Sequence, residues 1–154
     1  MEELMEILEQ TFRDYRADLE KAEKKQKPMG GLLGFGSSLK DDACHEVFDE
    51  KAEQAVQRIR DAGPSPDEAE RAVRMLLDSR DGERWPLSSQ WMMRAAERHT
   101  LLLIPFLSGK AAAELYGEYT RRYKPWDRLP AQKEVCLALK EQREKTEDSS
   151  GRPG

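Results

Sequence analysis

Residues 85–107 constrain the fold more than any other part of the chain, because their second half is apolar in every direction. In the first half, apolar residues recur at helical spacing between polar ones, whereas residues 101–104, Phe106 and Leu107 leave no polar face. A helix that is apolar all round must be enclosed by other elements. We therefore expect residues 88–104 to form a central helix that ends at Pro105, with its C-terminal half wrapped by its neighbours.

The remaining sequence shows helical spacing of apolar residues and no strand-like alternation. Further helices are expected at 2–25, about 43–62, from Pro66, at about 109–123 and from Pro130 to about 145. The third of these begins with a capping box, in which Ser65 precedes a proline at the first helical position and Glu68 follows three residues later. The expected fold is an all-α, single-domain bundle of about five to six helices over residues 1–145, followed by a flexible C-terminal tail at 146–154.

Composition favours a soluble protein of the cytoplasm. The chain has 154 residues, of which 36% are charged, and a net charge of −4. No apolar run approaches the ~20 residues that a membrane-spanning helix needs, and the acidic N-terminus does not resemble a secretory signal. Cys44 and Cys136 are the only cysteines and stand in no metal-binding spacing, so we expect neither a metal nor another cofactor.

The first helix, 2–25, carries a continuous apolar seam over about three heptads. Two roles are open for this seam: it docks on the rest of the domain, or it projects and pairs with a second copy or a partner protein. The length is at the lower limit for a coiled coil, which favours docking. The residues that would mediate association are Leu8, Phe12, Tyr15 and Leu19.

Residues 28–42 form the most unusual local sequence, with four glycines among apolar side chains. We expect a loop that folds back onto the domain, either as a structural plug or as a lid over a pocket. A phosphate-binding loop is disfavoured, because no Walker pattern is present and no strand precedes it. The candidate loop or pocket residues are Gly31, Gly34, Phe35 and Gly36.

Three residues could support catalysis, namely Cys44, His45 and His99. A cysteine in the first turn of a helix has its thiolate favoured by unpaired amide groups, and a nearby imidazole could act as a base. Adjacent helical residues point about 100° apart, however, and Cys44 shares the apolar face of its expected helix with Phe48. A buried thiol and a core histidine are the simpler interpretation, and His99 would need an acidic partner from another helix to act in catalysis.

Residues 121–128 interleave cations with aromatic side chains. This segment could bind a protein partner with Trp126 as an anchor, or hold a nucleic-acid backbone and stack a base. Alternatively, the basic residues complement the C-terminus of the fifth helix while Trp126 packs across the following turn. Nucleic acid is the less favoured partner because the chain as a whole is acidic. The partner-binding candidates are Arg121, Arg122, Lys124, Trp126 and Arg128.

No complete catalytic constellation is present in the sequence. We therefore expect a cytoplasmic helical module, binding or regulatory, that acts through protein–protein interaction. Two alternatives remain: a small enzyme or thiol-dependent sensor that uses Cys44 and His45 under the glycine-rich loop, and a nucleic-acid-associated accessory protein that uses residues 121–128.

Overall fold

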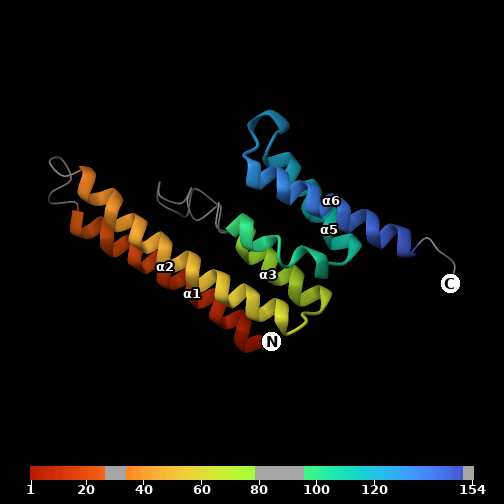
Figure 1. The fold of residues 1–154 in the computed structure, drawn as a ribbon, viewed down its shortest axis with the longest axis horizontal. Helices are drawn as coiled ribbons and strands as arrows, with labels where there is room; N and C mark the ends of the chain where they lie inside the picture. Colours follow the sequence, from red (N-terminus) through yellow and green to blue (C-terminus); the bar gives the residue numbers. More distant parts are fainter. Residues whose placement is uncertain (27–33, 79–95, 151–154) are drawn as a thin grey trace.

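The computed structural model describes residues 1–26, 34–78 and 96–150, with side chains at 1–21, 44–77 and 96–145. The fold is all-α, as the sequence predicts, and the described residues contain no strand. Two antiparallel helical hairpins, α1/α2 and α5/α6, make the most extensive contacts, and α3 lies between them (Figure 1). Buried side chains from both hairpins belong to one continuous hydrophobic cluster.

The first hairpin pairs α1 (Glu2–Gln26) with α2 (Gly34–Asp61). The predicted seam of α1 lies inside this hairpin, because Leu8, Phe12, Tyr15 and Leu19 are all buried in the core. The Phe48 ring of α2 packs against two of them, with ring centroids 5.2 Å from Phe12 and 4.4 Å from Tyr15. Of the two roles left open by the sequence, the fold thus shows docking, and the four seam residues are occupied within the chain.

The expected loop at 28–42 is wrong over most of its length, because α2 begins at Gly34 rather than near residue 43. Gly34, Phe35 and Gly36 therefore lie in the first turn of a helix, while Gly31 lies outside the described residues. A helical glycine costs only about 1 kcal/mol relative to alanine. Extending a helix that is already packed avoids the cost of a new nucleus, so the glycines do not stop it.

Helix α3 (Pro66–Asp78) begins with the predicted capping box. The Ser65 backbone N–H donates to Glu68 Oε1 at 2.9 Å, and the Glu68 N–H donates to Ser65 Oγ at 3.2 Å. Two arginines of this helix then reach in opposite directions. Arg71 pairs with Glu2 of α1 at 2.9 Å, and Arg74 pairs with Glu118 of α5 at 3.1 Å. Helix α3 therefore links the two hairpins through charged contacts as well as through the core.

The central segment is shorter as a helix than expected. Residues 96–100 are helical and residues 88–95 lie outside the described part, but the α-helix does not continue to 104. Instead, the Leu102 and Leu103 N–H groups donate to the carbonyls three residues earlier, and a 3-10 turn, η1 (Ile104–Phe106), follows. Pro105 has no N–H to donate to the Leu101 carbonyl, so the α-helical hydrogen-bond pattern cannot continue through this segment.

The predicted enclosure of the Leu-rich segment is nevertheless confirmed for its key side chains. Leu103, Ile104 and Leu107 are each no more than 2% exposed, whereas Leu101 and Leu102 are half-buried. The turn η1 contacts both α3 and α6. The apolar segment thus lies where the two hairpins meet, and it joins their cores.

The second hairpin pairs α5 (Gly109–Arg122) with α6 (Pro130–Ser150). Ser108 caps α5, since its hydroxyl accepts the Ala111 N–H at 3.1 Å. Gln142 of α6 donates to the Pro105 and Leu107 carbonyls, which ties the hairpin to the central segment. Helix α6 extends to Ser150 rather than to about 145, so the expected flexible tail is helical over 146–150. No described helix has both the length and the apolar character that a membrane crossing requires.

Candidate functional site

Residues 121–130 connect α5 to α6 and form what we call the tip. Helix α5 ends where Tyr123 takes an extended conformation, and a short 3-10 turn, η2 (Pro125–Asp127), follows. Pro125 and Pro130 each stand at the start of a helical turn, where a proline's fixed φ is favourable and its missing N–H costs nothing. The prolines therefore set both the end of one helix and the beginning of the next.

Hydrogen bonds stabilise the backbone of the tip. The Arg128 Nε–H donates to the Tyr123 carbonyl at 2.9 Å, which closes the turn across five residues. Within that turn, the Asp127 N–H donates to the Lys124 carbonyl, also at 2.9 Å. The Leu129 N–H donates to Oε1 of the buried Gln132 at 2.9 Å, which caps α6. Arg128 thus shapes the tip through its own side chain.

The tip presents a large apolar side chain to solvent. Trp126 is 79% exposed and Leu129 is 44% exposed. The alternative that Trp126 packs across the following turn is therefore wrong. Single exposed apolar residues need no explanation, but a fully presented tryptophan on a fixed backbone is typical of binding surfaces, where Trp is enriched.

Positive charge surrounds Trp126. Residues 121–130 contain four cationic residues and one acidic residue, in a chain whose net charge is −4. Arg121 and Lys124 are exposed, and Arg121 donates from Nε to the Gly117 carbonyl at 3.1 Å. The Arg122 guanidinium lies 6.0 Å from the centroid of the Tyr123 ring. The tip therefore combines a local positive potential with one aromatic anchor.

The three catalytic candidates have different partners. His45 is buried on α2 and shares a short hydrogen bond through Nδ1 with the hydroxyl of Tyr15. His99 is only 2% exposed, and its Nε2 lies 2.9 Å from Asp49 Oδ1. Cys44 is half-buried and packs against the core. Among the described side chains, no group of three or more His, Cys, Asp or Glu residues could hold a metal ion.

Asp49 is the acidic partner that His99 requires, and sequence reasoning did not find it. Asp49 accepts a hydrogen bond from His99. It also accepts from Arg98, whose Nη2 lies 2.6 and 2.7 Å from the two carboxylate oxygens of Asp49. Burial lowers the pKa of His99 below its ordinary value of 6.5, while the bond to Asp49 acts in the opposite direction. The imidazole is therefore neutral at pH 7, and as an N–H donor to a carboxylate it ties segment 96–100 to α2.

Glu97 is a charged residue of the central segment, and the structure buries it to 1% exposure. The Tyr119 hydroxyl of α5 donates to its Oε1 at 3.2 Å. A buried carboxylate needs such a donor, because transfer out of water is otherwise costly. Segment 96–100 thus has polar contacts to α2 on one side, through His99, and to α5 on the other.

Protein-family models, curated proteins and solved structures were all compared with this chain, and none of them matches it. The chain's own geometry therefore supplies the functional argument. Within the described residues, that geometry distinguishes two kinds of polar group. His99, Asp49 and Glu97 bind other parts of the same chain, whereas Lys124 and Trp126 at the tip face solvent.

Proposed function

We propose that this protein is a helical binding module that recognises an acidic protein surface with the tip of its α5/α6 hairpin. The observation that carries the proposal is the 79% exposure of Trp126 on a backbone fixed by hydrogen bonds. Trp and Arg dominate the energetically important positions of protein interfaces. A surface that is already ordered loses little entropy on binding, which favours affinity.

The burial of one side chain supplies most of the expected binding energy. An aromatic side chain of this size buries about 150–250 Å² when fully covered, and burial contributes about 25 cal/mol per Å². Since Trp126 is 79% exposed, covering it would contribute about 3–5 kcal/mol before the cost of association. The surrounding cations would contribute mainly to orientation and to the rate of encounter.

An acidic protein fits this surface better than nucleic acid does. Proteins that bind single strands usually offer several aromatic platforms along a basic groove, whereas the exposed aromatic side chain of the tip is Trp126 alone. The net charge of −4 also opposes the approach of nucleic acid and of anionic lipid surfaces. A compact acidic patch can meet the local positive charge of the tip without covering the rest of the molecule.

A site-specific photo-crosslinker tests this proposal. The crosslinking residue replaces Asp127, which is exposed beside Trp126, in one variant and Lys110, an exposed residue at the opposite end of α5, in a matched control. In cells that produce the protein naturally, we expect the variant at 127, which keeps Trp126, to capture a defined partner protein that the control does not capture. Capture of nucleic acid or lipid at 127, or identical products at both positions, would contradict the proposal.

A further inference from the structure

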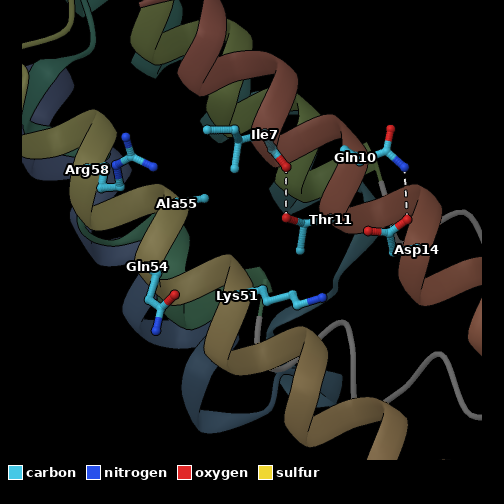
Figure 2. Close-up of a pocket in the computed structure, with 8 residues that line it drawn as sticks. All are labelled: Ile7, Gln10, Thr11, Asp14, Lys51, Gln54, Ala55 and Arg58. Carbon is cyan, nitrogen blue, oxygen red and sulfur yellow. Dashed lines mark hydrogen bonds between the residues drawn. The ribbon is translucent and has the colours of Figure 1, made fainter.

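A groove runs between α1 and α2 and is lined by side chains of both helices (Figure 2). Its volume is about 270 Å³. Ile7 stands in this groove with 39% of its surface exposed, beside the small side chain of Ala55. The remaining lining side chains are polar or charged: Gln10, Thr11, Asp14, Lys51, Gln54 and Arg58.

The two walls of the groove carry opposite charge. On α1, the exposed Asp14 lines the groove, and Glu3, which is exposed one turn before Ile7, lies beyond the lining, so this side is acidic. On α2, Lys51 and Arg58 stand seven residues apart and are likewise exposed. Asp14 accepts a hydrogen bond from Gln10 at 2.8 Å, but neither Lys51 nor Arg58 has an ion-pair partner among the described side chains.

This pattern is complementary to itself under a two-fold rotation. If the rotation axis runs parallel to the helices, α1 of one copy lies over α2 of the other at the same height along the hairpin. Asp14 and Lys51 lie toward the same end of the groove, and Ile7 lies toward the end with Ala55 and Arg58 (Figure 2). Asp14 of each copy would then face Lys51 of the other, and Ile7, which is 39% exposed, would be covered at the height of Ala55. All neighbouring helices would be antiparallel, as in a four-helix bundle.

The face is large enough for such an interface. Residues 2–21 of α1 span about 30 Å, and two helices side by side are about 20 Å wide. The available area is therefore roughly 600 Å² on each copy, which is at the lower end of stable interfaces. A two-fold axis perpendicular to the helices would instead place Lys51 of one copy near Arg58 of the other, and the repulsion between these two cations is unfavourable.

We propose that the outer groove of the α1/α2 hairpin binds a second copy of this chain, forming a two-fold dimer held by reciprocal contacts between Asp14 and Lys51. This surface is separate from the tip, and its lining does not include the seam residues Leu8, Phe12, Tyr15 and Leu19. Each dimer would present two tips, so a partner with two acidic sites would bind more tightly than either tip alone allows.

Charge reversal tests the dimer directly. In Asp14→Lys, both contacts join two cations, and in Lys51→Glu both join two anions, so we expect either variant to weaken dimerisation by about tenfold or more. When the two variants are mixed, both contacts again join opposite charges. One contact of the heterodimer pairs the two substituted side chains, with their charges exchanged, and the other pairs the unsubstituted Asp14 and Lys51. Sedimentation at low salt should therefore show dimers for the native chain, monomers for each variant, and heterodimers for the mixture.

Three outcomes would overturn the proposal: a monomeric native chain, variants that remain dimeric, or a mixture that remains monomeric. Both substituted residues are exposed, so circular dichroism should show native helix content in each variant. Glu3 lies one turn before Ile7, toward the end of the groove that holds Arg58, so Arg58→Glu with Glu3→Lys provides a second pair if one variant fails to fold. The tip proposal is independent of this result, because Trp126 is not part of the groove.

Discussion

Replacing Asp49 by alanine tests which of its two contacts stabilises the fold. Arg98 makes the shorter contacts, at 2.6 and 2.7 Å, but its side chain is 62% exposed. His99 is 2% exposed, so the loss of Asp49 leaves its N–H buried and without this acceptor. An exposed ion pair contributes about 0.2–1 kcal/mol, whereas a buried polar group without a partner costs about 1–3 kcal/mol. The contact of Asp49 with His99, although longer, should therefore contribute more to the stability of the fold than its contact with Arg98.

We accordingly expect Asp49→Ala to lower the free energy of unfolding by about 1–3 kcal/mol and Arg98→Ala by less than about 1 kcal/mol. Asp49→Asn keeps an oxygen acceptor for His99 and should lie between the two. Urea denaturation followed by circular dichroism provides the measurement, provided that the slope of the transition is the same in all variants. Equal losses for Asp49→Ala and Arg98→Ala would refute the reasoning.

Three further predictions concern the fold. Ser65→Ala removes a capping hydrogen bond of α3 and should lower the free energy of unfolding by about 1 kcal/mol, as measured by chemical denaturation. Because burial lowers the pKa of His99, the unfolded chain binds a proton below pH 6.5 that the folded chain does not. The free energy of unfolding should therefore fall as the pH drops through 6.5. His99→Gln should reduce the slope of this fall with pH. Tyr119→Phe removes one donor to the buried Glu97 and should cost about 1 kcal/mol in a thermal or chemical melt, the typical net contribution of a hydrogen bond. Unchanged stability in Ser65→Ala or Tyr119→Phe, or an unchanged pH slope in His99→Gln, would contradict the corresponding contact.

Helix positions were predictable from the sequence where capping chemistry or proline sets the boundary. The starts at Pro66, Gly109 and Pro130 agree with the structure, because each has a local signal that does not depend on distant contacts. The start of α2 at Gly34 was not predictable in this way. At Gly34, the small free-energy cost of placing glycines in a helix opposes the extension of α2. Whether α2 extends depends on how well the rest of this helix is packed, which the local sequence does not show.

The polar contacts of the interior could not be predicted, since they join residues far apart in the chain. Asp49 and His99 are 50 residues apart, and Glu97 and Tyr119 come from different elements. Their spacing within each helix carries no sign of the partner. The exposure of Trp126 was equally open, because the same sequence allows a turn that covers the ring and one that presents it. The hydrogen bonds of Arg128 and Gln132 that stabilise the tip likewise depend on the folded backbone and are not visible in the sequence.

The affinity of the Trp126→Ala variant for the partner captured at position 127 is the most direct test of the proposed function. Since Trp126 is 79% exposed, the substitution should leave the free energy of unfolding within about 0.5 kcal/mol of the native chain. Titration calorimetry should show affinity reduced by about 30-fold or more, the loss expected for truncation of an interface anchor. An affinity equal to that of the native protein, at equal stability, would show that the tip is not the binding surface.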